Sequence, residues 1–369
     1  MEYKKIGEII ELHRGYDLPV EQMEVGDVPV VGSNGIVGYH NQERSISPTV
    51  TIGRSGSIGK IHFYNSFTWV HNTALYIIDF KGNNPWYIYY VLKNLNFENL
   101  KSSSVVPSLN RNYIYPLKVP FYNNTDDQEK ISRTLQIIDK KIALNLKMNA
   151  ELEAMAKQLY DYWFVQFDFP DKNGKPYKSS GGKMVWNEKL KREIPEGWEA
   201  KEISSILDSV KPTPRLTTDE YLQKGTYAII DQTSDIYYAG FTNRGDAVSY
   251  QYPAVVFGDH SCSVKYVNFP YARGADGTQV MLSNNERVSV EYLYFAVKLI
   301  KLNKGYARHY SFVKDSLIIM PSHTIALNFK SIVERLFIQL TNNRKEIVFL
   351  TNLRDSLLPM LMNGQISIE

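Results

Sequence analysis

The sequence predicts an α+β protein with two similar domains of mixed strands and short helices, separated by two long antiparallel helices that form a coiled coil. Three observations predict this organisation. Segments of the first half of the chain recur in the second half, and each half ends in a long run of heptad-spaced apolar residues. Short strand-like runs closed by turn residues occupy the remainder.

The internal repeat is clearest at two glycine loops. Gly53, in the run Ile52–Lys60, recurs 205 residues later as Gly258, in the run Phe257–Ser261. Solenoid and propeller repeats are only about 20–50 residues long, so this spacing indicates two whole domains, which suit a ligand with two half-sites. The same offset aligns His71–Leu75 with Asp276–Val280, and Ile142, Leu152 and Met155 with Ile347, Leu357 and Met360.

The composition is that of an ordered globular chain, since 43% of its 369 residues are hydrophobic and 22% are charged. The single cysteine, Cys262, excludes an internal disulfide framework and suits a reducing cytoplasm. No segment resembles a signal peptide or reaches the roughly 18–20 apolar residues of a membrane span. The net charge of +3 argues mildly against a nucleic-acid binder, although a local basic stripe can serve that role.

The first domain is expected to span residues 1–122 and to consist mainly of strands. Its turn signal is the Asn-Gly pair that closes the first apolar run. The predicted elements are, in order, a strand at Val28–Val31, a turn at Gly32–Gly35, strands at Thr49–Ile52 and Ala74–Ile78, a short helix at Trp86–Leu95 and a polar loop at 105–112.

The clearest helix in the sequence is expected within residues 123–166. Thr125–Gln128 has the pattern of a capping box, in which the Thr and Gln side chains bond reciprocally to the first turn. A heptad seam follows, with steps of four and three residues and no Gly or Pro before Phe169. Its apolar members are Ile131, Leu135, Ile138, Ile142, Leu152 and Leu159, and Asn145 and Asn149 interrupt it.

A second long helix is expected within residues 323–364. It should begin between Thr324 and Asn328, and Asn363-Gly364 should cap its end. Pro359 is expected to bend or end the helix locally. The seam of this helix contains Leu336, Leu340, Ile347, Leu350, Leu357 and Leu361, and it is interrupted by Asn343 and Arg354.

The two apolar seams are expected to pack on each other. The chain must run out along the first helix, build the second domain and return, which favours an antiparallel coiled coil. The polar interruptions cost stability, but they fix the register and orientation of such a pair. The alternative is that the counted positions lie on the solvent-facing side of each helix.

The second domain and a linker arm before it are expected to span residues 167–322. Residues 171–183 are rich in Gly, Lys and Ser and have no periodicity, which is typical of a linker or surface arm. Ile194–Trp198 then opens the domain. Ile203 and Ile206 repeat Ile6 and Ile9 at an offset of 197, so the loops differ in length between the two copies.

The motifs of known catalytic and cofactor sites are missing from the sequence. Gly53–Lys60 fails the phosphate-loop pattern, because five residues separate Gly53 from Gly59 and Ile61 replaces the hydroxyl that would hold Mg²⁺. The histidines form neither an HExxH motif nor a Cys/His cluster, and Rossmann-type and Ser/His/Asp signatures are lacking. The sequence therefore predicts no catalytic residue, no metal site and no cofactor bound by this chain.

The glycine loops are instead predicted to be tight turns whose amides and side chains touch phosphates or base edges. Structural hairpins with solvated side chains are the alternative. The candidate DNA-contacting residues of both domains are Ser33, Asn34, Arg54, Ser55, Ser57, Lys60, Asn110, Arg111, Gln232, Thr233, His260, Ser261, Lys265, Arg273, Arg308 and His309.

Five stretches together carry a family resemblance. They are Arg54–Lys60, the transition from Val119-Pro120 to Gln128, Tyr162–Pro170, Asn173–Met184 and Ile194–Glu199. With these motifs the chain resembles, over essentially its whole length, the DNA-specificity (S) subunit of Type I restriction–modification systems. One departure is that Met320–Ile325 replaces the family's usual Pro-Pro and Glu-Gln at the start of the second helix.

The resemblance implies two target-recognition domains, each of which reads one half of a split, asymmetric site in double-stranded DNA. The helices would act as a ruler for the unread spacer. A helix of about 35 residues is about 50 Å long, which is enough to hold two domains about one DNA turn apart. A protein-interaction scaffold of two modules on a coiled-coil spacer is the alternative class.

The resemblance also implies partners and a setting. The S subunit is non-catalytic, and it recruits two modification subunits that use S-adenosylmethionine to methylate adenine. Restriction subunits that use ATP and Mg²⁺ then join the complex for defence against foreign DNA in the bacterial or archaeal cytoplasm. The outer faces of the paired helices are the implied dock for the modification subunits.

Overall fold

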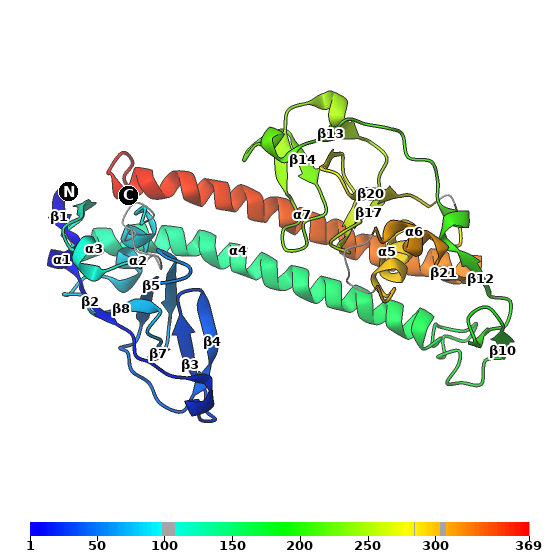
Figure 1. Cartoon of the computed structure of the whole chain (residues 1–369), viewed down its shortest axis with the longest axis horizontal. Helices are drawn as coiled ribbons and strands as arrows, with labels where there is room; N and C mark the ends of the chain where they lie inside the picture. Colours follow the sequence, from blue (N-terminus) through cyan, green and yellow to red (C-terminus); the bar gives the residue numbers. More distant parts are fainter. Residues whose placement is uncertain (98–107, 284, 303–307, 369) are drawn as a thin grey trace. The chain divides into compact units, whose positions relative to one another are not determined.

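The computed structural model describes residues 1–97, 108–283, 285–302 and 308–368 (Figure 1). The chain forms two compact units. Unit 1 comprises Met1–Asn145 and Glu346–Glu369, and unit 2 comprises Leu146–Lys345. Each unit therefore contains one strand-rich domain and a part of each long helix. No helix in the described ranges is long and apolar enough to cross a membrane.

The first domain is built from two small sheets. Val31 and Val70 of one sheet pack against Ala74 and Tyr76 of the other. The antiparallel sheet has the order β2 (Glu11–Arg14), β8 (Ala74–Asp79), β5 (Thr49–Gly53), β6 (Ile61–Tyr64), and the second sheet has the order β4 (Gly35–His40), β3 (Val28–Gly32), β7 (Trp69–Val70). The short elements are β1 (Glu2–Lys5), which pairs with β9 (Lys118–Phe121), and α1 (Ile6–Ile9), η1 (Val20–Gln22) and α3 (Arg111–Ile114).

Helix α2 (Pro85–Lys93) covers the other face of the antiparallel sheet. The sequence starts it at Asn84, whose Oδ1 accepts a hydrogen bond from the Tyr87 amide at 3.0 Å. Pro85 follows at the first helical position, where no amide hydrogen is needed. Tyr87 and Ile88 of α2 are buried in the same core as Ile52 of β5.

The second domain repeats this plan with additional strands. Helix α5 (Val290–Lys298) covers a sheet with the order β18 (Val264–Val267), β17 (Ala254–Gly258), β20 (Thr278–Met281). The second layer contains β13 (Arg215–Leu216), β19 (Tyr271–Gly274), β14 (Tyr227–Ile230), β15 (Gly240–Thr242) and β16 (Val248–Ser249). The remaining elements are β12 (Glu199–Glu202), which pairs with β21 (Leu317–Met320), and η4 (Ile203–Ile206), η5 (Thr218–Glu220), η6 (Gly245–Ala247) and α6 (Tyr310–Asp315).

The strand register corrects one part of the predicted repeat by a single residue. Strands β5 and β17 begin 205 residues apart, as expected, and so do α2 and α5. However, Ile52 lies opposite Leu75, whereas Phe257 lies opposite Gln279. Thr73 therefore corresponds to Gly277, and not to Thr278, because the connection between the paired strands is one residue shorter in the second domain.

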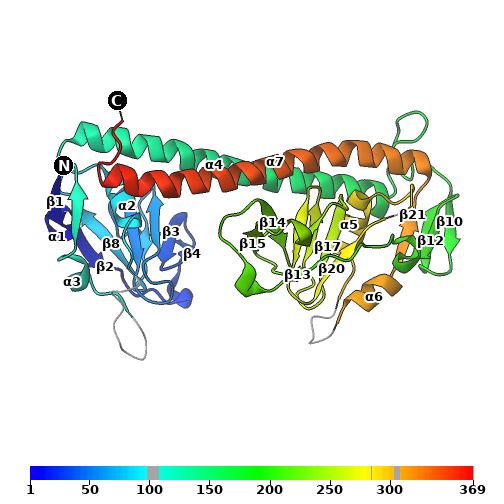
Figure 2. The ribbon, with the colours of Figure 1, turned by 90° about the horizontal axis from the view of Figure 1, so that it is seen from above.

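Helices α4 (Thr125–Tyr160) and α7 (His323–Met362) pair antiparallel within each unit (Figure 2). In unit 1, Asp139 of α4 bonds to Arg354 of α7 at 2.8 Å, and Asn145 bonds to Glu346 at 2.8 Å. In unit 2, Glu153 bonds to Arg344 at 2.7 Å, and the Tyr160 ring lies 6.0 Å from that of Phe329. In both units the partner number falls as the α4 number rises, so the expected antiparallel arrangement is confirmed.

The two helices begin 198 residues apart, whereas the sequence predicted an offset of 205 for their seams. The difference is one heptad, and a heptad pattern looks the same when it is displaced by one repeat. At the observed offset Asn145 matches Asn343, and both side chains are buried. The predicted matches of Ile142, Leu152 and Met155 are therefore displaced by one heptad.

The ends of α7 differ in part from the prediction. The helix begins at His323, before the expected Thr324–Asn328 range, and it continues through Pro359 to Met362. Pro359 does not end it, because this residue lies close to the C-terminus and its carbonyl still accepts the Asn363 amide at 2.9 Å. Gly364 adopts φ +69°, and the Gln365 amide bonds to the Met360 carbonyl at 2.9 Å, as in a glycine C-cap.

The predicted seam positions are all buried or partly buried. Phe329, Val333 and Phe337, which the heptad count did not include, are more buried than Leu336, because this part of α7 also packs into the second domain. A helix that faces two neighbours needs a wider apolar face than a heptad seam provides. The buried positions are Ile131, Leu135, Ile138, Leu340 and Leu361, and the partly buried ones are Ile142, Leu152, Leu159, Leu336, Ile347, Leu350 and Leu357.

Residues 171–183 form an ordered surface arm after the π-helical turn η3 (Asp161–Val165). The Phe169 ring stacks on Tyr177 at 4.6 Å and on Trp198 at 4.9 Å between centroids. The Ser179 hydroxyl and amide both donate to Asp168 and thereby hold the pKa of that carboxyl below its usual value. A hairpin of β10 (Met184–Asn187) and β11 (Arg192–Pro195) follows.

We expect Trp198→Ala to lower the free energy of unfolding by about 3–5 kcal/mol, the usual cost of removing a large buried aromatic ring. Trp198 is 7% exposed, and its ring stacks on that of Phe169 and lies tilted against that of Phe164 in the π-helical turn. Urea denaturation followed by circular dichroism measures the change. Trp186→Ala is the matched control, because Trp186 is 57% exposed and its loss should leave stability nearly unchanged. Equal effects of the two substitutions would contradict the role assigned to the stack.

Candidate nucleic-acid interface

Several loops of the first domain meet at one edge of its two sheets. The loop from Arg54 to Gly59 closes on itself, because the Gly59 amide bonds to the Gly53 carbonyl at 2.8 Å and the Gly53 amide bonds to the Lys60 carbonyl at 2.8 Å. A Cβ on Gly53 would lie 2.0 Å from the Ser57 carbonyl oxygen and 3.0 Å from that of Ser33. Glycine is therefore required for the loop and the β3–β4 turn to approach so closely.

Thr73 links the loops of this edge through hydrogen bonds. Its carbonyl accepts hydrogen bonds from the amides of Arg54 at 2.8 Å and Ser55 at 3.1 Å. Its hydroxyl accepts the Ser33 amide at 3.3 Å and lies 3.1 Å from His71 Nδ1. Three segments that are distant in sequence are thus held side by side at the ends of β3, β5 and the start of β8.

The predicted contacts of the first glycine loop gather on this edge. Lys60 Nζ donates to Asn34 Oδ1 at 2.7 Å, and the Ser57 hydroxyl lies 3.3 Å from the same oxygen. These side chains are exposed or partly exposed, so the structure places Ser33, Asn34, Arg54, Ser55, Ser57 and Lys60 in one polar surface cluster. We call these six residues the polar edge of the first domain.

Arg14, which the sequence motifs did not identify, lies beside Arg54. Burial lowers the pKa of the Arg54 guanidinium first, and the positive charge of Arg14 lowers it further. Within the described residues neither arginine makes an ion pair with a carboxylate. Adjacent, uncompensated arginines favour the binding of an anion such as a phosphate. The only sequence signal for Arg14 was its position at the end of a strand, just before Gly15.

Asn110 and Arg111 already have structural partners. Asn110 is the N-cap of α3, and its side-chain oxygen accepts the Asn112 amide at 2.9 Å. Arg111 Nη1 donates to the Leu12 carbonyl at 2.8 Å. Both side chains remain partly available to a ligand because their residues are exposed. The predicted polar loop 105–112 lies partly outside the described residues.

The equivalent edge of the second domain carries different chemistry on the same backbone plan. The Asp259 amide bonds to the Gly277 carbonyl at 2.7 Å, as the Arg54 amide bonds to that of Thr73. An acidic residue therefore stands where the first domain has an arginine, but Asp259 is buried and its Oδ1 accepts the Tyr310 amide at 2.8 Å. Gln232 Nε2 donates to the Asp276 carbonyl at 3.0 Å, and the Gln232 carbonyl accepts the Ser261 hydroxyl at 2.5 Å. Thr233, His260 and Arg308 are exposed nearby or in adjoining loops.

Three candidates of the second domain have partners within the fold. Lys265 is 6% exposed, donates to the Ile236 carbonyl at 2.7 Å and pairs with Asp231 at 3.7 Å. The Arg273 guanidinium donates to the Thr278 carbonyl and to Gln279 Oε1, so it supports the connection between two strands. His309 is buried, and its amide bonds to the Asp259 carbonyl. Lys265 and His309 are buried and Arg273 is partly buried because of their strand or loop positions, which residue type alone does not indicate.

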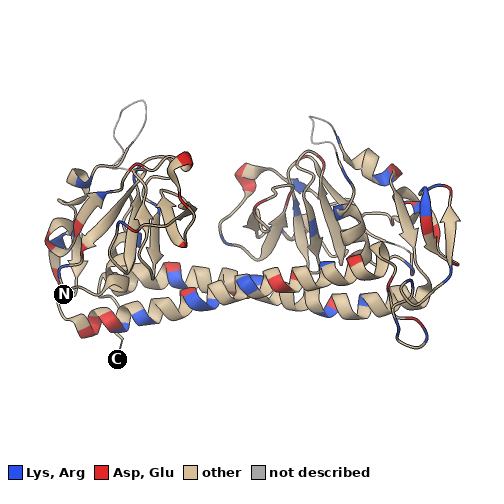
Figure 3. Cartoon of the chain, turned by 90° about the horizontal axis from the view of Figure 1, so that it is seen from below, with Lys and Arg blue, Asp and Glu red and all other residues tan. Residues whose placement is uncertain are grey.

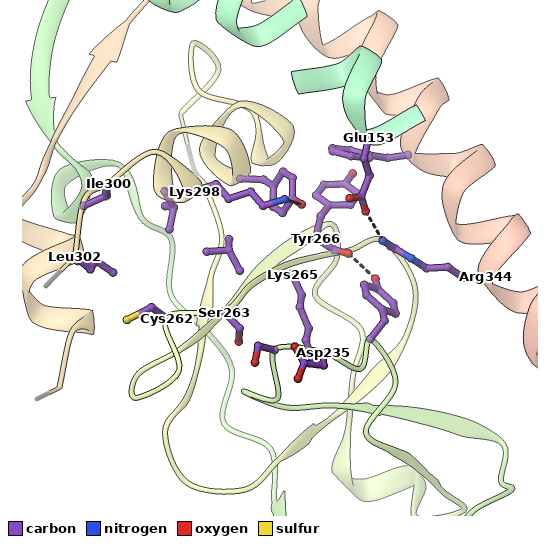
Figure 4. A pocket seen from close by; sticks show the side chains of 16 residues that line it. Glu153, Asp235, Cys262, Ser263, Lys265, Tyr266, Lys298, Ile300, Leu302 and Arg344 are labelled. Atoms are coloured by element: carbon purple, nitrogen blue, oxygen red, sulfur yellow. Dashed lines mark hydrogen bonds and ion pairs between the residues drawn. The ribbon is translucent and has the colours of Figure 1, made fainter. Parts of the chain in front are cut away.

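A pocket of about 580 Å³ in unit 2 lies where the second domain meets both long helices (Figure 4). Several of its charged side chains have partners within the fold. Arg344 bonds to Glu153 at 2.7 Å and lies 3.8 Å from the Tyr237 ring centroid, while Lys298 donates to Tyr294 at 2.8 Å. These interactions hold the domain on its helices, and we assign the pocket no ligand. Among the described residues no His, Cys, Asp and Glu side chains cluster as metal ligands.

The Lys and Arg residues that the structure describes do not form one continuous basic face. Lys and Arg are interspersed with Asp and Glu along α4 and α7 in Figure 3. The candidate interface is therefore defined by the loop edges of the two domains, which the repeat brings to equivalent positions, and not by bulk electrostatics. Two similar domains, each with its own polar loop edge of different chemistry, define a two-site recognition protein.

Comparison with known proteins shows what the chain is similar to. Residues 1–154 match the model of the Type I restriction modification DNA specificity domain. The Type I restriction enzyme MjaIX specificity subunit of Methanocaldococcus jannaschii is 26% identical over 309 residues, which cover 77% of this chain and 69% of that protein. The chain is also similar to the crystal structure of the Type-I restriction-modification system S subunit from M. genitalium, with a TM-score of 0.67 and 17% sequence identity. The match covers 98% of this chain and 96% of that chain.

The resemblance predicted from the sequence motifs is therefore confirmed. Residues 1–154 are similar to the Type I DNA specificity domain, and the whole chain shares the fold of the M. genitalium S subunit.

We expect the free energy of unfolding to fall as the pH is lowered through about 6.5, the usual pKa of an unfolded histidine. Burial lowers the pKa of His62 in the folded protein, and its Nε2 is buried without a hydrogen-bond partner in the described structure. The unfolded chain therefore takes up the proton more readily. Urea denaturation at several pH values should show that His62→Gln loses less stability than the wild type on acidification.

His323→Gln is the control for this pH measurement, because His323 is half exposed at a helix terminus. It should follow the wild-type profile. Parallel pH profiles for His62→Gln and the wild type would contradict the assignment.

Proposed function

We propose that this chain is the DNA-specificity subunit of a Type I restriction–modification complex. It reads a bipartite, asymmetric sequence in double-stranded DNA and recruits modification subunits that methylate adenine, together with restriction subunits. The observation that supports this most directly is the pair of equivalent loop edges with different side chains at the surface, such as Ser55 in one domain and His260 in the other. Such a pair suits two unlike half-sites.

In the first half-site, Arg14 and Arg54 contact backbone phosphates, since an arginine without a carboxylate partner is available to a phosphate. Asn34, Ser57 and Lys60 contact base edges or phosphates from the adjoining loop. In the second half-site the corresponding contacts come from Gln232, Thr233, His260, Ser261 and Arg308. Lys265, Arg273 and His309 support these loops from within.

The chain itself is not an enzyme in this proposal. S-adenosylmethionine, ATP and Mg²⁺ are bound by the partner subunits, and the assembly acts in the cytoplasm, where its DNA is found. The modification subunits dock on the helices away from the recognition domains. Ile137 and Leu144 support this role, because they are exposed apolar residues seven positions apart on one face of α4. A protein-interaction scaffold without DNA has no support from the family match.

Methylome sequencing of cells that express this chain with its modification partner tests the proposal. A bipartite methylated motif with two unlike halves is expected. Exchange of residues 1–122 for the same domain of a relative should change one half and leave the other intact. Absence of any motif that depends on this chain would overturn the proposal, and a change in both halves would refute independent reading.

We expect Arg14→Ala and Arg54→Ala each to weaken DNA binding by the complex similarly at matched and mismatched sites, because phosphate contacts carry no sequence information. Each substitution should reduce the slope of log K against log salt by roughly one, the effect of one lost phosphate contact. Fluorescence anisotropy at several salt concentrations measures both quantities. Lys130→Ala, on the exposed first turns of α4, is the control and should leave the slope unchanged.

The proposed ruler role of the helices generates a separate test. Four residues inserted after Asn145 in α4 and four after Lys345 in α7 lengthen each helix by about 6 Å and rotate it by about 40°. Each unit keeps its own pairing, because the insertions fall between Asn145–Glu346 and Asn149–Asn343. The variant should methylate the same half-sites with a longer spacer.

Two-residue insertions at the same places serve as the comparison. They rotate the helix face by about 200° and expose its apolar side. These variants should be poorly soluble or unable to bind the modification partner. An unchanged spacer in an active four-residue variant would show that the helices act only as a dock.

A further inference from the structure

Strand β4 of the first domain has an irregular register next to the polar edge. Ile36 lies opposite Val31, and Gly38 lies opposite Val30, so Val37 is an extra residue on β4. This is a β-bulge, a feature that re-aims side chains and is common at the edges of sheets and near functional sites. β4 is also the outer strand of its sheet.

The bulge leaves two consecutive apolar side chains exposed. Ile36 is 49% exposed and Val37 is 58% exposed. Successive side chains of a regular strand point to opposite faces, so a strand on the surface of a domain normally alternates between covered and exposed positions. Here the alternation is broken at the residues that directly follow the Asn34-Gly35 turn.

Val37 lies beside the groups that organise the polar edge. A Cβ added to Gly32 would be 3.3 Å from Val37 Cγ1 and 3.1 Å from Thr73 Oγ1, so both side chains meet over the bare α-carbon of Gly32. Thr73 in turn bonds to the amides of Ser33, Arg54 and Ser55. The apolar spot is therefore part of the same surface as the candidate phosphate and base contacts.

We propose that Val37, with Ile36 beside it, contacts the 5-methyl group of a thymine in the first half-site. The inference rests on the proposed function and deepens it. The thymine methyl is the apolar group that base pairs present in the major groove, and an apolar side chain among polar contacts discriminates it. Pairing of β4 with a strand of another protein is disfavoured, because the bulge interrupts the row of hydrogen-bonding groups that such pairing needs.

Replacement of thymine by uracil tests the contact, because uracil lacks only the methyl group. Duplexes that carry uracil at one thymine position of the first half-site at a time are titrated with the purified complex. At one position the wild-type complex should bind roughly fourfold more weakly, the effect of about one methyl group left in water. Uracil in the second half-site should have no such effect.

Val37→Ala links the effect to the side chain. It should bind the thymine duplex roughly fourfold more weakly than the wild type and show no further loss with uracil, since the contact is already removed. Val25→Ala is the matched control, because Val25 is fully exposed in the same domain, before β3, and it should keep the wild-type response to uracil. Thermal unfolding should be the same for both variants.

Three results would overturn the inference. They are a first half-site without an A·T pair, no uracil position that weakens binding, or a Val37→Ala variant that keeps the full response to uracil. In each case specific binding of the normal duplex by the wild-type complex would leave the proposed function intact. Loss of that specific binding would instead refute the proposed function.

Discussion

The fold depends on the burial of helix segments that complete each domain from a distant part of the sequence. Leu358, Leu361 and Met362 of α7 belong to the same apolar core as Ile6 and Tyr87 of the first domain. In unit 2, Tyr160 and Phe164 belong to the core that contains Phe329. The core of unit 1 is thus built from segments on both sides of the second domain in the sequence, and the core of unit 2 joins parts of both helices. Neither domain is therefore complete until both helices are paired.

The polar residues inside the helix pair make that pairing specific. Gln128 is fully buried and bonds to Asn83, Asn84 and Tyr122, which fixes the start of α4 on the first domain. Asp139 receives hydrogen bonds from both Tyr90 and Arg354, which joins the domain to both helices. Such groups add less stability than apolar side chains would, but a displaced register leaves them unpaired, and that penalty selects one alignment.

The same backbone plan can therefore carry two different readouts. The loop edges are held by backbone hydrogen bonds through Thr73 and Gly277, which need no particular side chain at the neighbouring positions. Ser55 and the equivalent His260 can then differ completely without disturbing the strands. Because these candidate contact side chains are separate from the backbone groups that hold the loops, either domain can change its surface chemistry while the helices stay the same.

The sequence by itself determined the duplication, the heptad seams, the antiparallel pairing and the family motifs, because these depend on local periodicity and on spacing along the chain. It also indicated the loop and the turn that contain the six residues of the polar edge. It did not determine that Arg14 joins Arg54, that Lys265 and His309 are buried, or that Val37 is turned outward by a bulge. Those facts were decided only by the tertiary structure, since strand register and the packing of one sheet on another determine which side chains are exposed to solvent.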